Sequence, residues 1–413
     1  MVNQVNHANG VTVNHDKDAN DMARPGRIWT SGAASNWNSG VFQFDGAGNV
    51  VKIGSDYNLY DKVSRVTIGA PRAAAYTQSY TYDAFGNITQ INTNGNVYAT
   101  ATSTSTNRLT SATYDAAGNV TGYQGYSYYY DPFNQQRQLT GTGLNQYSYY
   151  NAAGERIGFK DVPTNVTTLT ARGLDGKPLR EYTYNGSSWS WSKDYIWREG
   201  KVLAVIDSAG TRHFAVDHVG SVRLITNSDT GKTVWGYHAY YPFGEEAATT
   251  WDAERIKFTG HERDLHGSTD TLDDLDYMHA RCYKPVSAER FFSVDPGRDA
   301  DPKSPQSWNL YVYVRNNPLK FTDPTGTAIV FDHNLNAFFG WGGEPDFQQS
   351  QNLRTALSTA ITGALGAPRG GATQRGGRGP RPALEVDLSL GAAPAGRQPV
   401  PGPCRQETLE PGP

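Results

Sequence analysis

The sequence predicts an all-β protein built from stacked β-hairpins. Three observations support this fold class: one tyrosine-rich motif recurs along the chain, glycine and tyrosine are abundant (44 and 25 of 413 residues), and methionine is rare (three residues). Tyrosine favours strands, and glycine favours the tight turns that join them. A chain of this length can form two or three domains or one long repeat array.

The recurring motif is aromatic-x-aromatic-Asp-x-x-Gly-Asn-aliphatic. It occurs at residues 42–50, 80–88 and 112–120, more weakly at 147–157, and once more with Asn134 in place of glycine. The aspartate starts a turn by accepting bonds from its own backbone, and glycine or asparagine adopts the positive φ that closes it. The predicted turn residues are Asp45 and Gly48, Asp83 and Gly86, and Asp115 and Gly118.

Each copy therefore predicts one hairpin whose alternating rings lie on one face. One hairpin cannot bury these rings, so neighbouring hairpins must stack into a continuous array. Repetition of one specific pattern argues against unrelated hairpins in a sandwich. Strand signals continue from 179 to 240, where residues 197–206 predict a turn followed by an apolar strand, and Asp217 and Gly220 repeat the turn pattern.

Composition and spacing argue against several kinds of site. The formal net charge of -3 disfavours general nucleic-acid binding. His213 and His218 have no carboxylate or cysteine at a diagnostic spacing, so we expect turn or strand-surface histidines, no metal site and no cofactor. Cys282 and Cys404 are not expected to pair, because Cys404 lies in a Pro/Gly-rich tail. No window reaches the ~18 apolar residues of a membrane span, and the N-terminus lacks the apolar core of a signal peptide.

An ordered series of motifs fills residues 237–326. The motifs lie at 240–245, 258–264, 275–285, 290–296, 307–318 and 323–326. Proline and glycine in the first, fifth and last of them predict turns. Residues 311–314 predict a strand, whereas 275–281 are compatible with either a short strand or a helical turn.

Together, the repeats at 40–160 and this motif series resemble RHS/YD-repeat proteins that end in an RHS repeat-associated core domain, a family that includes polymorphic toxins and insecticidal ABC toxin shells. The resemblance implies that the hairpins form part of a curled β-sheet shell. With so few repeats, we expect a fragment, or one end of a shell that another chain completes. The implied division is a poorly defined segment (1–39), a repeat array (40–236), the core domain (237–326) and a variable tail (327–413).

The resemblance also implies a reaction. Some RHS proteins and ABC toxin components cut their own chain just after the core, using an arginine and two aspartates. By motif these residues are Arg281, Asp295 and Asp323, and the expected scissile bond joins Thr327 to Ala328. Two neighbouring carboxyl groups share one proton, so the ionised one activates water and the protonated one polarises the carbonyl. We assign the base to Asp295 and its partner to Asp323, with exchanged roles as the alternative. The arginine would orient or stabilise a carboxylate.

Several departures from the family pattern leave this activity open. Cys282 and Lys284 replace Tyr and Asp, residues 286–289 lack a usual Gly, residues 297–305 lengthen the gap between the aspartates, and Thr327 replaces Leu. The alternative is that both aspartates only stabilise turns. At most, the sequence predicts a self-cleaving aspartyl peptidase.

The tail carries a toxin or another effector in that family. Here residues 353–361 predict one short amphipathic helix, and the Gly/Pro/Arg-rich chain from about Gly363 predicts disorder. No catalytic constellation surrounds His333, the single histidine of the tail.

The leading hypothesis is a secreted or cell-surface shell scaffold that encloses or presents a C-terminal passenger. Its expected partners are further shell segments or a companion shell protein, and an immunity protein; another part of a larger product, or a partner, would direct export. The second hypothesis is a cell-surface recognition module that binds glycans or proteins through exposed Tyr and Trp strands. The third is a truncated remnant with no function of its own.

Overall fold

The computed structural model describes residues 4–249, 253–265, 274–297 and 305–331. Regular structure in these ranges is almost entirely β-strand, which confirms the all-β prediction. The helical elements there are short 3-10 turns: η1 (Phe258–Gly260), η2 (Pro305–Trp308) and η3 (Val314–Asn316). The predicted tail helix and the disorder from Gly363 lie outside the described residues.

The first sheet has ten antiparallel strands that neighbour one another in chain order. They are β1 (Gln4–Asn6), β2 (Thr12–Lys17), β3 (Pro25–Ser31), β4 (Asn38–Phe44), β5 (Val50–Ile53), β6 (Asp56–Tyr60), β7 (Val66–Ala70), β8 (Gln78–Tyr82), β9 (Ile88–Thr93) and β10 (Asn96–Ala99). Because sequence neighbours pair along the whole sheet, it is a meander of consecutive hairpins, as stacked repeats require.

The second sheet continues this arrangement with fourteen strands, again in chain order. They are β11 (Thr113–Tyr114), β12 (Val120–Tyr123), β13 (Tyr126–Tyr130), β14 (Gln136–Gly141), β15 (Leu144–Tyr150), β16 (Arg156–Asp161), β17 (Val166–Arg172), β18 (Pro178–Tyr184), β19 (Trp189–Arg198), β20 (Lys201–Asp207), β21 (Gly210–Val216), β22 (Val222–Asn227), β23 (Val234–Tyr240) and β24 (Glu246–Thr249). The apolar strand predicted after residue 200 is β20.

The Asp-x-x-Gly segments lie at the bends between strands. Asp45 Oδ1 accepts the N–H groups of Ala47 (2.9 Å) and Asn49 (2.8 Å). Asp83 and Asp115 occupy the same position in the β8–β9 and β11–β12 turns. The residue closing each turn has a positive φ: Gly48 (76°), Gly86 (80°), Gly118 (92°) and Asn134 (61°). Left-handed backbone favours glycine or asparagine, which accounts for the residue types in the motif.

The segment before residue 40, expected to be poorly defined, forms regular strands. It forms β1, β2 and β3, which pair in antiparallel register with one another and with β4. Val13 and Ile28 are buried and pack in one cluster with Phe42. These strands have the alternating pattern of a half-buried strand but lack the Asp-x-x-Gly turn motif on which the prediction relied.

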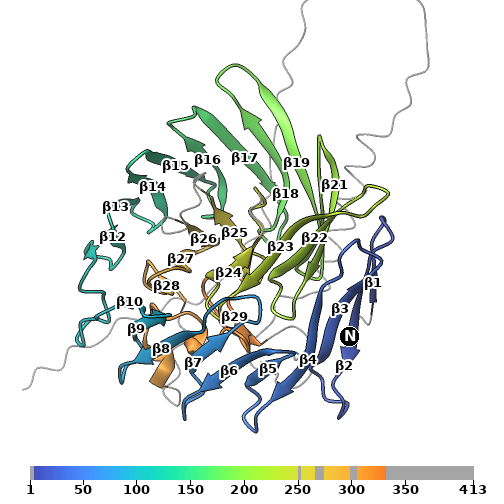
Figure 1. Ribbon diagram of the computed structural model, residues 1–413. Coiled ribbons are helices and arrows are strands. Elements are labelled where there is room, and N and C mark those ends of the chain that lie inside the picture. The colour runs from blue at the N-terminus through green and yellow to red at the C-terminus, as the bar shows by residue number, and fades with distance from the viewer. Residues whose placement is uncertain (1–3, 250–252, 266–273, 298–304, 332–413) are drawn as a thin grey trace, which may run out of the picture. The chain divides into compact units, whose positions relative to one another are not determined.

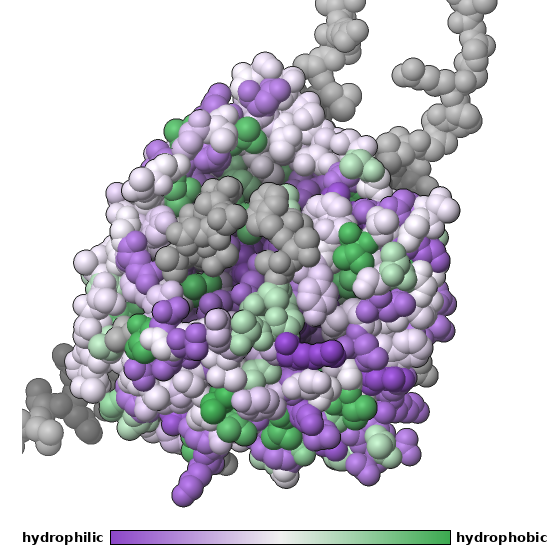
Figure 2. Space-filling model, in the orientation of Figure 1, coloured by the Kyte–Doolittle hydropathy of each residue, from purple (hydrophilic) through white to green (hydrophobic). Residues whose placement is uncertain are grey.

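Contacts between the sheets bring the N-terminal hairpin against the second sheet. The ring of His7 lies 5.2 Å from that of His213 in β21, and Asn9 Nδ2 donates to Thr226 Oγ1 (3.1 Å) and Asn227 O (3.0 Å). The two sheets curve around the described core residues, 253–265, 274–297 and 305–331 (Figure 1). On the face shown in Figure 2, hydrophilic and hydrophobic residues are interspersed rather than gathered into one apolar patch.

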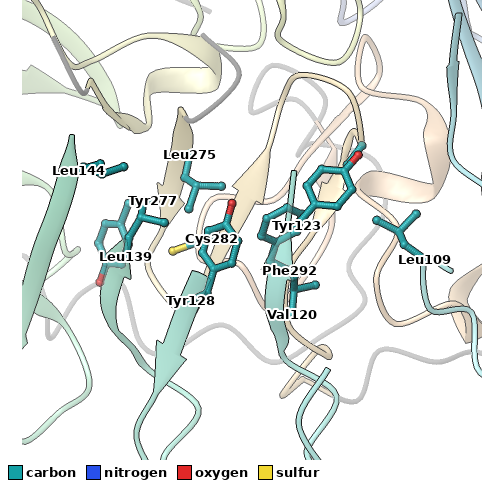
Figure 3. Packing of buried hydrophobic residues seen from close by; sticks show 11 residues of the cluster. Leu109, Val120, Tyr123, Tyr128, Leu139, Leu144, Leu275, Tyr277, Cys282 and Phe292 are labelled. Atoms are coloured by element: carbon teal, nitrogen blue, oxygen red, sulfur yellow. The ribbon is translucent and has the colours of Figure 1, made fainter. Parts of the chain in front are cut away.

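The enclosed residues form a small sheet and a short hairpin. The strands are β25 (Glu262–Asp264), β26 (Leu275–Met278), β27 (Arg281–Lys284) and β28 (Arg290–Phe291), with β29 (Phe321–Thr322) paired to β30 (Val330–Phe331). Residues 275–284 are thus a β-hairpin, which settles the choice between strand and helical turn. Tyr123 and Tyr128 of the second sheet pack edge-on against Phe292, with ring centroids 5.6 and 5.2 Å apart (Figure 3). The inward rings of the repeats are therefore buried by the enclosed segment as well as by one another.

The predicted strand at 311–314 is wrong. Only Val312 forms an isolated bridge, to Arg290, and residues 314–316 all have positive φ. The side chains of this region reach the repeat turns instead: Asn316 Nδ2 donates to Gly86 O and Asn317 Nδ2 to Asn49 Oδ1, both at 2.8 Å. The alternating aromatic pattern resembled a strand, but the polar turn contacts of the neighbouring asparagines determine the backbone.

Candidate functional site

The three residues assigned to self-cleavage come from separate segments and meet in the structure. Arg281 begins β27, Asp295 follows β28, and Asp323 follows β29. Arg281 Nη2 lies 3.0 Å from Asp295 Oδ2 and 3.0 Å from Asp323 Oδ2. One guanidinium therefore joins the two carboxyl groups, a contact that sequence spacing alone could not establish.

The group is largely withdrawn from solvent. The side chains of Arg281 and Asp323 are each 2% exposed, and that of Asp295 is 10% exposed. The guanidinium also lies over the ring of Phe291, 3.5 Å from its centroid. Burial raises the pKa of Asp323, and the neighbouring Arg281 charge offsets only part of this effect. Asp323 is therefore suited to carry the shared proton.

The loop after Asp323 is held by its backbone. The three consecutive carbonyl oxygens of residues 324–326 are contacted in turn by His261 Nε2 (3.3 Å), the Ala280 N–H (3.1 Å) and Arg281 Nε (2.5 Å). A Cβ atom on Gly326 would lie 2.2 Å from Met278 O, so this close approach requires glycine. The loop is thereby fixed against the β26–β27 turn.

The expected scissile bond lies beside Asp323. Asp323 Oδ1 accepts the N–H groups of Thr327 (3.1 Å) and Ala328 (3.2 Å). In the repeat turns the aspartate contacts residues two and four positions ahead, as Asp45 does, whereas Asp323 contacts residues four and five ahead. Its hydrogen bonding thus differs from that of a repeat-turn aspartate, and it includes the nitrogen of the expected scissile bond.

The carbonyl of the same bond lies near Asp295. A Cβ atom on Gly297 would lie 2.2 Å from Thr327 O and 3.0 Å from Asp295 Oδ1. Asp295 Oδ1 also accepts the Gly297 N–H at 2.8 Å. The carboxylate and the carbonyl oxygen therefore face the same small space on one side of Gly297.

Further residues build this site without having been predicted. The Leu310 carbonyl accepts Arg281 Nη1 at 3.1 Å and the Asp295 N–H at 3.1 Å. His261 holds the loop through Pro324 O, with its Nδ1 2.8 Å from Thr259 Oγ1. The Leu310 contact uses its backbone carbonyl and leaves no sequence signal, whereas His261 belongs to the motif at residues 258–264, which by itself indicates no role.

Two residues that depart from the family pattern, Cys282 and Lys284, are buried in the core. Cys282 is buried in the cluster of Figure 3, and burial raises its pKa to about 12, so its thiol is not a nucleophile at neutral pH. Lys284 is fully buried and donates to Asp274 O at 3.2 Å.

His218 lies in the Asp217–Gly220 turn, as expected, and His213 lies in β21, but both side chains are buried rather than at the surface. His213 Nε2 lies 2.9 Å from Ser228 Oγ, and His218 Nε2 lies 2.9 Å from Leu319 O. The curvature of the sheets around the core covers both side chains. Among the described residues, no group of three or more His, Cys, Asp or Glu side chains could hold a metal ion. The same residues include no helix long and apolar enough to cross a bilayer.

No family model matches the chain, but three curated proteins do. It is 28% identical over 288 residues to the tRNA3(Ser)-specific nuclease WapA of Bacillus spizizenii (63% of this chain, 11% of that protein). It is 27% identical over 301 residues to toxin subunit YenC2 of Yersinia entomophaga (61% and 29%), and 33% identical over 105 residues to toxin subunit YenC1 (24% and 9%). The chain spans less than a third of each relative.

Solved structures share its fold. A TcdB2-TccC3 crystal structure superposes with a TM-score of 0.62 at 20% identity, covering 78% of this chain and 19% of that one. A Photorhabdus luminescens Tc holotoxin pore gives 0.63 at 19% identity, covering 82% and 19%. The chain is therefore similar in sequence to a tRNA-specific nuclease and two toxin subunits, and in fold to proteins of toxin complexes.

Proposed function

We propose that this chain is a segment of an RHS-type β-shell that encloses or presents a C-terminal passenger, and that it releases this passenger by cutting its own backbone between Thr327 and Ala328. The curved hairpin sheets and the toxin-subunit relatives support the shell assignment. Because similar structures contain TcdB2 together with TccC3, we propose a companion shell protein as partner. On this proposal, the protein acts outside the cell that makes it.

The contact between Asp323 Oδ1 and the Ala328 nitrogen, at 3.2 Å, carries the self-cleavage proposal. The Ala328 N–H donates in this contact, so Asp323 lies at the leaving nitrogen and can protonate its lone pair once the nitrogen becomes pyramidal in the tetrahedral intermediate. Arg281 contacts both carboxyl groups and remains charged, so it favours one ionised and one protonated partner in a buried site. The other carboxylate, Asp295, faces the carbonyl side of the same bond.

The reaction consumes one water molecule. Asp295 accepts a proton from this water as the water oxygen bonds to the Thr327 carbonyl carbon. Asp323 then gives its proton to the Ala328 nitrogen as the C–N bond breaks. The products are a new carboxyl terminus at Thr327 and a new amino terminus at Ala328, with Asp295 protonated and Asp323 ionised.

Time-resolved synthesis of the full chain tests this proposal. Cell-free translation, sampled over time, should yield a C-terminal fragment that begins at Ala328 by mass spectrometry. Asp295→Asn and Asp323→Asn should both stay intact. Asp45→Asn is the matched control and should still cleave, because Asn151 already makes the equivalent turn bonds at 3.0 Å. A wild-type chain that stays intact from pH 3 to 9, or a cut that persists in both site variants, would remove the proposal.

Glycan recognition is a second candidate, favoured by the β18–β19 hairpin. Tyr182 lies opposite Trp191 and Tyr184 opposite Trp189, and these tryptophan residues are 40% and 50% exposed, respectively. Exposed flat rings of this kind stack on the C–H faces of sugars. Glycan-array binding by the intact Asp295→Asn chain that is lost in Trp189→Ala would support recognition; no binding to any glycan would reject it.

A further inference from the structure

Leu310 connects the candidate site to the shell. Its carbonyl oxygen accepts both Arg281 Nη1 and the Asp295 N–H, each at 3.1 Å. Arg281 uses its other terminal nitrogen, Nη2, to contact the two carboxyl groups. A displacement of the Leu310 carbonyl would therefore displace the guanidinium relative to both carboxyl groups.

The residue before Leu310 is fastened to the first sheet. Asn309 is buried, and its Nδ2 donates to Asn87 Oδ1 at 2.6 Å and to Phe85 O at 3.2 Å. Both acceptors lie in the Asp-x-x-Gly turn between β8 and β9. Asn309 Oδ1 in turn accepts the Tyr311 N–H at 3.2 Å, which fixes the backbone on the far side of Leu310.

The residue after Leu310 is fastened to the second sheet. Tyr311 Oη donates to Gly118 O at 2.8 Å, in the turn between β11 and β12. Its ring lies 6.1 Å from that of Tyr114 and beneath the guanidinium of Arg290. The Leu310 peptide is thus held between one turn of each sheet.

We propose that Asn309 and Tyr311 are positioning residues that couple self-cleavage to the docking of both sheets on the core. The inference rests on the proposed self-cleavage. Only when the β8–β9 and β11–β12 turns are in place does the Leu310 carbonyl hold Arg281 against the two carboxyl groups. A misplacement of about 1 Å at such a site lowers a rate by about 100-fold, so these remote contacts can control the reaction.

The chain offers a matched control at Asn317. Its Nδ2 donates to Asn49 Oδ1 at 2.8 Å, so it repeats the Asn309–Asn87 contact at the β4–β5 turn, and both asparagines are buried. Its own backbone contacts are to Val314, Lys320 and Phe321 rather than to Arg281 or Asp295. Asn309→Ala and Asn317→Ala therefore remove the same kind of bond with different consequences for Leu310.

The experiment compares first-order cleavage rates of full chains made by cell-free translation, with unfolding free energies measured in the uncleaved Asp295→Asn background. Asn309→Ala and Tyr311→Phe should each slow cleavage by about 100-fold. Asn317→Ala should lose similar stability but slow cleavage by less than about threefold, because its bond to Asn49 does not position Leu310.

The pH–rate profile separates positioning from general destabilisation. A guanidinium held less closely stabilises the ionised base less, so the ascending limb should move to higher pH in Asn309→Ala and stay in place in Asn317→Ala. Equal slowing by the two alanine variants in proportion to lost stability, with unmoved limbs, would overturn the coupling. A wild-type chain that never cleaves would instead refute the proposed function.

Discussion

Asn119 Nδ2 donates to Asn134 Oδ1 at 2.9 Å and so joins two successive turns of the second sheet. In the first sheet, Asn87 makes the same 2.9 Å contact to Asn107. Both acceptors have positive φ and close a neighbouring turn. The asparagine that follows glycine in the repeat is therefore the residue that fastens one hairpin to the next.

Loss of this contact should destabilise the shell. Asn119→Ala removes the bonds to Asn134 and to Asp115 Oδ2 (2.8 Å) at a buried position, so we expect the unfolding free energy to fall by about 1–3 kcal/mol. Urea denaturation in the Asp295→Asn background measures this fall in unfolding free energy. The exposed Asn96→Ala should change stability by less than about 0.5 kcal/mol. Similar values for the two variants would contradict the role assigned to Asn119.

Cleavage should depend on pH in the sense set by Asp323. Burial raises the pKa of this carboxyl above its usual 3.8, and the reaction requires its protonated form. The rate should therefore fall as pH rises through that raised pKa. On the acidic side of the maximum, the rate should increase with pH as the base Asp295 loses its proton. First-order rates between pH 3 and 8 should give a bell-shaped profile. A rate that keeps rising across this range would rule out Asp323 as the proton donor.

A buried acid near the first sheet should make stability pH-dependent. Both carboxyl oxygens of Glu289 are buried without a hydrogen-bond partner among the described residues. Burial, with Glu245 nearby, raises the pKa of Glu289 well above 4.5. The folded chain therefore holds a proton that the unfolded chain has released at neutral pH, so stability falls as pH rises from 4.5 towards the folded-state pKa.

Glu289→Gln should remove this loss. The variant should be more stable than the parent at pH 7, and equally or less stable near pH 4. Between these values its stability should change less with pH than that of the parent. Thermal unfolding across pH, again in the Asp295→Asn background, measures the difference. The exposed Glu199→Gln serves as the control and should follow the parent curve. A parent curve without this slope would show that Glu289 ionises at its ordinary pKa.

A side chain at Gly297 should block cleavage without unfolding the protein. Its Cβ would lie 2.2 Å from Thr327 O and 3.0 Å from Asp295 Oδ1, so Gly297→Ala must shift the scissile carbonyl relative to the carboxyl group. We expect the rate to fall by about 100-fold. Gly46→Ala is the matched control, because nothing lies within 4 Å of its Cβ position. Unchanged cleavage in Gly297→Ala would mean that the carbonyl approaches the base from another side.

Much of the fold follows from signals that are local in sequence. The strand β20 follows from an apolar run after a turn, and the hairpin stacking follows from one motif repeated along the chain. The strand predicted at 311–314 failed because its backbone is set by contacts with turns some 200 residues away. Burial of His213 was missed for the same reason, since it depends on how the sheets curve.

The candidate site was predictable only in its residue types. The resemblance pointed to Arg281, Asp295 and Asp323, but their meeting depends on how β27, β28 and β29 lie together. The contribution of Leu310 is a backbone carbonyl and could belong to any residue type. Gly297 could have been noticed only with the Thr327 carbonyl already placed beside it.

The tether between Leu310 and both sheets also sets an order in time. A ribosome releases the turn at Gly118 before Thr327, and at about 5–20 residues per second the delay between them is about 10–40 s. Hairpins fold within microseconds, so both sheets can form before the peptide bond between Thr327 and Ala328 has been synthesised. On the proposed function, cleavage would therefore follow the folding of the two sheets around the site.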